Sequence, residues 1–275
     1  MIEVIFLIAL GLIWIIFAVL QDLKKREIAN WLNFSLIIFA LGFRFFYCLF
    51  SGTDFNFFYY GLMGFAIFFI LGNVFYYSKI FAGGDAKLMI ALGGVLPLTG
   101  TINGNLNLFL IFILLFLIVG AIYGFLFSVI LVIKNFKKFK KEFLKNFSKN
   151  KKLFYLALVI CAILIFVSFF LELVIYLAVI AFIFPYLYFS AKSLDETCMI
   201  KEISTKKLTE GDWLYRGVRV KNRFIKYTWD GLTKEEIQIL KKTDKKVLIR
   251  QGIPFSPVFL IAYLVWFYFF IRTFY

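Results

Sequence analysis

Long runs of apolar residues alternate with short polar segments along most of this chain. Several runs reach about 18 or more residues, the length that a helix needs to cross a bilayer. The fourth run is short and contains Gly93, Gly94 and Pro97, so we expect it to be broken or to cross only in part. The eight predicted spans cover residues 4–21, 32–50, 57–77, 87–98, 108–133, 153–171, 173–191 and 254–273.

The overall composition agrees with this pattern. Hydrophobic residues make up 63% of the 275 residues, aromatic residues make up 21%, and the mean hydropathy is +0.89. A soluble domain of this length could not bury so much apolar surface. Backbone groups in lipid must bond within their own segment, and the continuous runs do not alternate as barrel strands do. The sequence therefore predicts an all-α polytopic membrane protein of about eight transmembrane helices, with a small cytoplasmic α+β module.

Basic residues are concentrated in alternate loops. The chain has 31 Lys and Arg residues and 16 Asp and Glu residues. The basic residues cluster in segments 22–31, 79–87, 134–152 and 192–253. Loops with an excess of Lys and Arg stay in the cytoplasm. We therefore expect a multi-pass protein of the cell membrane with its N terminus outside. Because topology accounts for the positive charge and no nucleic-acid motif accompanies it, the lipid bilayer is an expected partner and nucleic acid is not.

The polar segments divide the chain into five predicted parts. Segment 134–152 has aromatic residues at helical spacing among lysines, which is typical of a helix on an anionic membrane face, and a charged linker is the alternative. Segment 192–253 has a turn at 210–213, strands at 218–220 and 247–249, and a helix whose capping box is Thr233 and Glu236. The parts are a membrane-embedded catalytic core (1–133), a basic amphipathic cytoplasmic segment (134–152), a transmembrane hairpin (153–191), a cytoplasmic module (192–253) and a C-terminal transmembrane helix (254–275).

The residue types exclude several kinds of chemistry. The chain has no histidine, so catalysis by a histidine base and most transition-metal sites are excluded. The three cysteines, Cys48, Cys161 and Cys198, are far apart and form no CxxC pair, which argues against a disulfide framework or a zinc site. We expect neither a metal nor a cofactor. Arg44, inside the second span, is expected to have a structural role, such as stacking on an aromatic ring or fixing the bundle.

Two aspartates lie at the ends of predicted spans. Asp22 follows the first span and Asp85 precedes the fourth, so both fall on the predicted cytoplasmic side. Carboxylates at membrane depth are costly and are candidates for function, and a pair that shares one proton performs aspartyl proteolysis. Each has a simpler interpretation when taken alone. Asp22 could be solvated among juxtamembrane lysines, and Asp85 could cap a helix after a Gly-Gly-Asp turn.

Gly83 and Gly84 directly precede Asp85. Residues without a Cβ adopt unusual dihedral angles and allow another backbone to approach closely. We therefore expect these glycines to present Asp85 on a bend and to offer backbone groups to an extended substrate strand.

Two motifs resemble those of a known family. Gly83-Gly84-Asp85-Ala86-Lys87, after an apolar span, resembles the Gly-x-Gly-Asp signature of membrane-embedded aspartyl peptidases, with Ala82 in place of the first glycine. The block from Asp22 to Asn30 resembles the first-aspartate block of type IV prepilin peptidases, which runs Asp-x-x-x-x-x-Ile-Pro-Asn, with Ala29 in place of the proline. Together they are similar to the archaeal prepilin and preflagellin (archaellin) peptidases.

This resemblance implies a function and a set of site residues. The chain would be a GxGD-type aspartic endopeptidase that removes the short basic leader, a class III signal peptide, from pilin-like or archaellin-like precursors at the cytoplasmic membrane face. Asp22 and Asp85 would be catalytic. The residues that would support the motif or contact substrate are Gly83, Gly84, Lys87 and Asn30.

Two other classes of function are compatible with the same aspartates. A proton- or cation-coupled transporter would use them as a relay or ion site, and it predicts pseudo-symmetric halves with charges near the bilayer midplane. A non-catalytic membrane scaffold of a pilus machine would need neither carboxylate. Loss of cleavage on replacing either aspartate separates the peptidase from both.

Overall fold

The computed structural model describes residues 2–220, 223–228, 231–243 and 246–274. Met1 and Tyr275, at the ends of the predicted parts 1–133 and 254–275, lie outside this description. The chain divides into two compact units. One combines residues 1–124 with 254–275, and the other is formed by 125–253.

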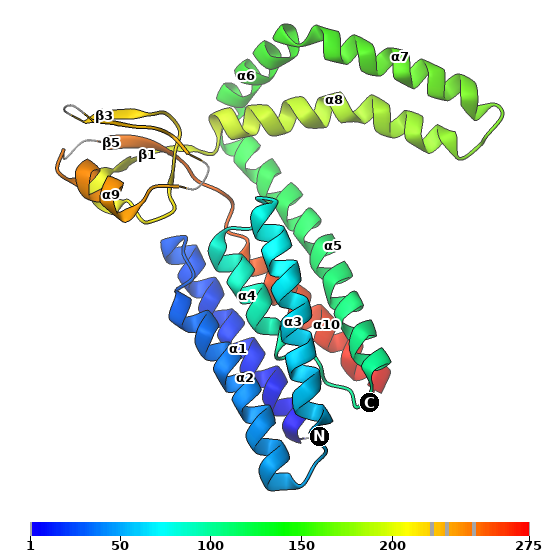
Figure 1. Ribbon diagram of the computed structural model, residues 1–275. Coiled ribbons are helices and arrows are strands. Elements are labelled where there is room, and N and C mark those ends of the chain that lie inside the picture. The colour runs from blue at the N-terminus through cyan, green and yellow to red at the C-terminus, as the bar shows by residue number, and fades with distance from the viewer. Residues whose placement is uncertain (1, 221–222, 229–230, 244–245, 275) are drawn as a thin grey trace. The chain divides into compact units, whose positions relative to one another are not determined.

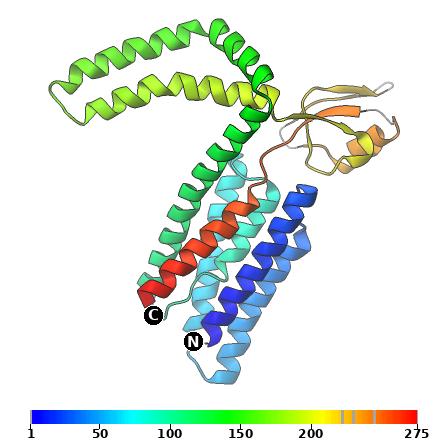
Figure 2. The ribbon, with the colours of Figure 1, turned by 180° about the vertical axis from the view of Figure 1, so that it is seen from behind.

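The first unit is a bundle of helices (Figure 1). The short helix α4 packs against α1, α2 and α3, and α10 packs along α1, as the view from behind also shows (Figure 2). Helix α5 continues past this unit into the second one. The helices are α1 (Ile2–Lys25), α2 (Asn30–Ser51), α3 (Asn56–Tyr77), α4 (Gly83–Gly93), α5 (Ile102–Lys134) and α10 (Ser256–Phe274).

The predicted membrane fold is confirmed. Among the described residues, α1, α2, α3, α5, α7 (Lys151–Ser168) and α8 (Val174–Thr197) are long and apolar enough to cross a membrane. Of the other two predicted spans, one forms the apolar helix α10, of which Ser256–Arg272 falls just short of the spanning length, and the other forms the much shorter α4. Helix α4 has 11 residues and ends at Gly93, within the predicted span 87–98, and a buried turn follows it. The early end agrees with the expectation that the fourth span is broken.

Small residues allow α4 to enter the bundle. A Cβ atom built on Gly64 of α3 would overlap the carbonyl of Gly93, and one on Gly93 would overlap the backbone of Gly64. Gly72 lies against the Ala86 carbonyl in the same way. Helices in membranes associate closely where such residues let their backbones touch. Helix α4 is therefore fixed by direct backbone packing on α3.

In the second unit, α6 (Phe136–Lys149) follows α5 and leads into the α7–α8 hairpin. Segment 134–152 is thus helical, as its spacing predicts. Part of its apolar face packs on α8 through Phe147 and Phe189, whose ring centroids are 5.7 Å apart. Asn146 donates hydrogen bonds to the Ser193 hydroxyl at 3.1 Å and to Glu196 Oε2 at 3.0 Å.

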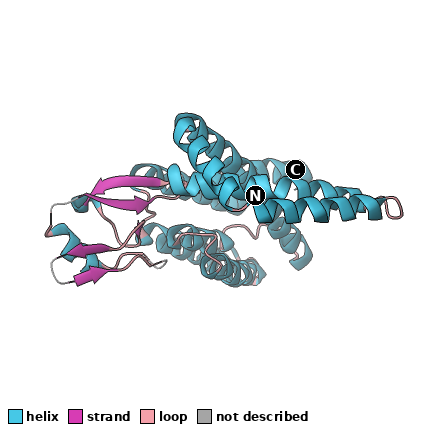
Figure 3. Ribbon diagram, turned by 90° about the horizontal axis from the view of Figure 1, so that it is seen from above, coloured by secondary structure: helices cyan, strands magenta, loops and turns pink. Residues whose placement is uncertain are grey.

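The strands of the second unit form two small antiparallel sheets, coloured magenta in Figure 3. One has the order β1-β5-β2 and the other is the β3–β4 hairpin. The predicted helix has the predicted capping box between Thr233 and Glu236, and the predicted strands at 218–220 and 247–249 lie in β3 and β5. The elements are β1 (Ile200–Ser204), a 3-10 turn (Thr205–Lys207), β2 (Trp213–Leu214), β3 (Val218–Val220), β4 (Arg223–Ile225), α9 (Lys234–Lys241) and β5 (Lys246–Arg250).

Candidate active site

Asp22 lies in the last turn of α1 and is buried, with 8% of its surface exposed. Its Oδ2 atom accepts a hydrogen bond from the backbone N–H of Ser256 at 3.2 Å. Ser256 is the first residue of α10, and the first N–H groups of a helix have no partner within the helix. The positive end of the helix dipole also favours a negative charge there. Asp22 is therefore held by the N-terminus of α10 and is not solvated among the neighbouring lysines.

Asp85 is the third residue of α4 and is equally buried, with 8% exposure. The backbone N–H of Ala82, which caps the helix, interacts favourably with this carboxylate. The N-cap residue is Ala82 and Asp85 lies within the first turn, so Asp85 does not occupy the cap position of its simpler interpretation. The charge of Asp22 also acts on Asp85, so the two carboxyl groups lie within electrostatic range of one another in the same unit.

The expectation that Gly83 and Gly84 form a bend is wrong. Both are helical residues in the first turn of α4, and neither is among the described glycines with a positive φ. The two glycines differ in how much space a side chain would have at each position. A Cβ on Gly84 would lie 3.2 Å from Cβ and 3.4 Å from the backbone nitrogen of Ile28, whereas one on Gly83 would lie 3.7 Å from Tyr76. Close packing on Ile28, and not an unusual dihedral angle, is what requires a glycine at position 84.

The connection between α1 and α2 docks onto the start of α4. Lys87 Nζ donates a hydrogen bond to Asn30 Oδ1 at 2.7 Å, and Asn33 Nδ2 contacts the Gly84 carbonyl at 3.4 Å. Together with the Gly84–Ile28 packing, these contacts join the two motifs that surround Asp22 and Asp85. The predicted residues Asn30, Gly84 and Lys87 therefore lie together, and Gly83 lies beside them in the helix.

The alanine at position 29 also has a structural explanation. Ala29 caps α2 with φ −64° and ψ 136°, which is a conformation that proline also adopts. Its backbone N–H donates to Gln21 Oε1 at 3.0 Å, a bond that a proline could not make. Here a hydrogen bond fixes the turn that the family motif fixes with a proline ring.

Two buried residues of this region were not identified from the sequence. Ser256 and Asn33 are fully buried, and Ser256 Oγ and Asn33 Oδ1 have no hydrogen-bond partner within the described protein. Most buried polar atoms have such a partner. Ser256 could have been noted because Ser-Pro before an apolar run marks a helix start, and Asn33 because it is a polar residue inside a predicted span.

An aromatic cluster joins three segments of the first unit. The ring centroid of Phe116 on α5 is 5.7 Å from that of Phe81, 5.8 Å from that of Phe255 and 4.7 Å from that of Phe259. Phe81 also contacts Phe259 at 6.0 Å. These rings join the loop before α4, the start of α10 and the middle of α5, so they set where both helix N-termini lie.

Arg44 fixes the opposite end of α4. It is fully buried, and its guanidinium lies 4.5 Å from the centroid of Phe57. It donates to the carbonyl of Gly94 at 2.9 Å and to that of Val95 at 3.2 Å, and it also donates to Pro97 and, at 2.9 Å, to the carbonyl of Phe57. Arg44 thus supplies hydrogen-bond donors to the backbone carbonyls of the turn after α4, where the helix has ended and its own N–H groups no longer reach them. The expected structural role of Arg44 agrees with these contacts.

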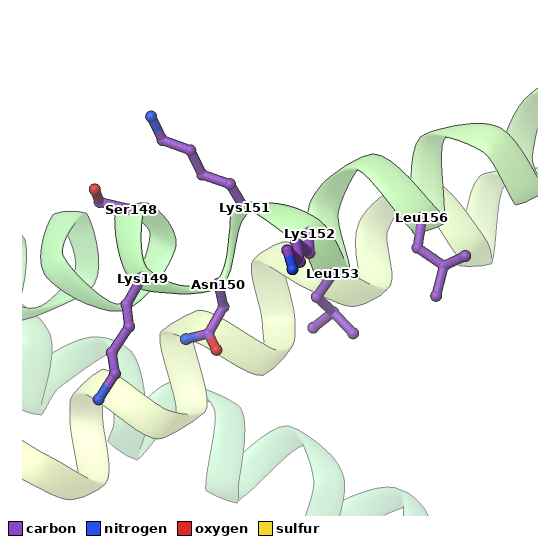
Figure 4. Close-up of a pocket in the computed structure, with 7 residues that line it drawn as sticks. All are labelled: Ser148, Lys149, Asn150, Lys151, Lys152, Leu153 and Leu156. Carbon is purple, nitrogen blue, oxygen red and sulfur yellow. The ribbon is translucent and has the colours of Figure 1, made fainter.

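Within the described residues, neither a cluster of metal ligands nor the pocket between α6 and α7 resembles the aspartate pair. Among the described residues, no three His, Cys, Asp or Glu side chains gather as a metal site would require. A surface pocket at the corner between α6 and α7 belongs to the second unit and has no carboxylate in its lining (Figure 4). It is lined by Ser148, Lys149, Asn150, Lys151, Lys152, Leu153 and Leu156.

Comparison with known proteins points to one family. Residues 9–133, which include both aspartates, match the sequence model of the type IV leader peptidase family. A preflagellin peptidase of Methanococcus maripaludis is 34% identical over 88 residues, which are 32% of this chain and 37% of that protein. One of Methanocaldococcus jannaschii is 33% identical over 87 residues, 32% of this chain and 36% of that protein. The chain thus aligns with little more than a third of the length of these curated relatives. No solved structure matches.

Proposed function

Because residues 9–133 match the sequence model of the type IV leader peptidase family, we propose that this protein is a membrane aspartyl endopeptidase that removes leader peptides from precursor proteins. The observation that carries the proposal is the burial of Asp22 and Asp85 in one unit, within electrostatic range of each other. Neighbouring carboxyl groups resist double ionisation and tend to share one proton. The two carboxyl groups come from different helices, α1 and α4.

The shared proton allows acid and base catalysis by the same pair. The ionised carboxylate takes a proton from the attacking water, while the protonated one donates to the oxygen of the scissile carbonyl. Because the pair titrates as a unit, neither role belongs to one aspartate in the free enzyme. The backbone N–H of Ser256 donates to Asp22, and that of Ala82 interacts with Asp85, so each carboxyl group has a backbone partner at a helix start.

The substrate that fits this position is a pilin-like or archaellin-like precursor, with a short basic leader ahead of an apolar helix. The curated relatives are preflagellin peptidases, which supports this class. A basic leader stays in the cytoplasm while the apolar helix enters the bilayer, so its cleavage point lies at the cytoplasmic face. Asp22 and Asp85 occupy helix ends next to the basic loops, on the side that charge assigns to the cytoplasm.

The position of the aspartates argues against a transporter. Asp22 is in the last turn of α1 and Asp85 is in the first turn of α4, so neither lies at the middle of a spanning helix. An ion relay through the membrane places its carboxylates near the midplane.

Isosteric replacement tests the proposal. In proteoliposomes, Asp22→Asn and Asp85→Asn should each reduce cleavage of an archaellin-like precursor by about 1,000-fold or more, because the amide can neither share nor transfer the proton. Asp54→Asn is the matched control, since Asp54 is exposed in the loop between α2 and α3 of the same unit. Cleavage at the wild-type rate by either site variant would show that the pair is not catalytic.

A further inference from the structure

We propose that Ser256 is a positioning residue for Asp22 and that α10 is part of the catalytic machinery, not a separate membrane anchor. The inference rests on the function proposed above. Ser256 lies outside residues 9–133, so the family match does not include it. The contact between Asp22 and Ser256 joins positions 234 residues apart in the chain, within one compact unit.

The start of α10 presents one particular donor to Asp22. The backbone N–H of Ser256 lies 3.2 Å from Asp22 Oδ2 in a buried environment. Pro257, the next residue, has no N–H, and the N–H of Val258 is bonded to the Phe255 carbonyl at 3.0 Å. The N–H of Ser256 is thus the first-turn donor directed at the carboxylate. Hydrogen bonds from a helix N-terminus stabilise the ionised form of such a group.

The hydroxyl of Ser256 supplies the second, independent observation. The residue is fully buried, and Oγ has no hydrogen-bond partner in the described protein. Only Cα and Cβ separate this oxygen from the nitrogen that contacts Asp22. Rotation about the Cα–Cβ bond therefore lets the hydroxyl donate to the same carboxylate as negative charge develops on it. Ser256 in this way offers Asp22 a fixed backbone donor and a movable side-chain donor.

Polar contacts also fix the position of α10 along the bundle. The Tyr263 hydroxyl donates to the Ile8 carbonyl at 3.1 Å, and Trp266 Nε1 donates to the Leu108 carbonyl at 3.1 Å. All four groups are buried, and Gly11 leaves the space that the Tyr263 ring occupies. A simple lipid anchor does not need specific hydrogen bonds to two neighbouring helices. These bonds set the height of α10 relative to α1, and so the distance from Ser256 to Asp22.

Three substitutions at position 256 separate the two donors. Ser256→Ala removes the hydroxyl and keeps the N–H. Ser256→Pro removes both, and proline suits the first position of a helix. Ser256→Thr keeps both donors and should restore activity. Lys234→Pro places a proline at the same position of α9 and is the matched control.

The readout is the pH dependence of kcat and KM for the full-length protein in proteoliposomes. Ser256→Pro should lower kcat by about 10- to 100-fold while KM changes by less than about 3-fold, because a contact of the reacting pair is lost and substrate binding is not. The pH profile of kcat should change as well, because the reacting pair has lost one of its hydrogen-bond donors. Ser256→Ala should show a smaller change in the same direction, and Lys234→Pro should keep the wild-type profile.

The result that overturns the inference is an active enzyme whose Ser256→Pro variant keeps the wild-type kcat and pH profile. Failure of the proposed function looks different, because Asp22→Asn would then retain cleavage. If Ser256→Pro does not fold, as judged by its melting temperature, an amide-to-ester exchange at position 256 in the Ser256→Ala background removes the same N–H without a ring. An unchanged profile in that variant overturns the inference equally.

Discussion

The rings of Phe81 and Phe255 lie in contact, with 5.8 Å between their centroids. Each ring directly precedes a residue whose backbone N–H is directed at one of the two aspartates. Ser256 follows Phe255 and donates to Asp22, and Ala82 follows Phe81 and interacts with Asp85. One aromatic contact therefore links the two backbone donors, and through them it sets the relative position of the carboxylates.

Replacing either of these two aromatic rings by a smaller side chain should disturb the relative position of Asp22 and Asp85. Phe81→Leu and Phe255→Leu each remove part of the contact. Each should lower the cleavage rate by more than its loss of stability, measured as the melting temperature, would predict. In a double-mutant cycle the two effects should be less than additive, with a coupling of about 0.5–1.5 kcal/mol for an aromatic pair. Phe45→Leu is the control, because its contact with Phe58 is near the α2–α3 loop. Additive effects would show that the rings act separately.

The two motif glycines should respond differently to alanine. Gly84→Ala places a methyl group 3.2 Å from the Ile28 Cβ atom, so the α1–α2 connection must shift and cleavage should fall by about 10-fold or more. Gly83→Ala meets its nearest atom at 3.7 Å and should keep near wild-type activity and gain slightly in helix stability. Initial cleavage rates measure both. Equal losses in the two variants would contradict the steric explanation.

Arg44 should be irreplaceable for stability. Arg44→Met leaves the carbonyls after α4 buried without their donor, which should destabilise the first unit by about 3 kcal/mol or more. Arg44→Lys should not restore stability, because an ammonium group cannot reproduce the planar fork of donors. Thermal unfolding in detergent measures the loss. A lysine variant as stable as the wild type would show that charge alone suffices.

Asp212 gives the second unit a pH dependence. Burial raises the pKa of the Asp212 carboxyl above its ordinary value of 3.8, although hydrogen bonds from Thr209 oppose the shift. The folded state then binds the proton more tightly than the unfolded state, so stability falls as pH rises through this window. Asp212→Asn keeps an acceptor for the Thr209 N–H and should remove that dependence. Hydrogen exchange across pH tests this, with exposed Glu210→Gln as the control that should match the wild type.

Much of the fold follows from the pattern of apolar residues. Span length predicts the six long helices, and the capping box of Thr233 and Glu236 predicts the start of α9. The role of α10 cannot be predicted from that pattern, because the sequence of an apolar helix is similar whether the helix faces lipid or protein. Its contacts depend on isolated polar atoms, such as the Tyr263 hydroxyl, whose partners lie far away in the chain.

The candidate site was predictable in part. The two aspartates and the residues of their motifs could be selected because each stands at a boundary between polar and apolar segments. The backbone donors of the aspartates could not be predicted, because every residue except proline has an N–H group and only the fold determines where that group points. The glycines were predicted to form a bend, whereas Gly84 instead allows close packing on Ile28. The sequence shows that a side chain is missing but not which neighbour occupies the space.

The separation of 234 residues between Asp22 and Ser256 has a consequence for biosynthesis. The ribosome delivers the first carboxylate early, but its donor emerges only after the intervening helices and the whole of 125–253 have been made. A nascent chain that has inserted α1 to α5 thus holds both aspartates without the contact that orients one of them. The contact between Asp22 and Ser256 can form only after α10 has been made and has packed along α1.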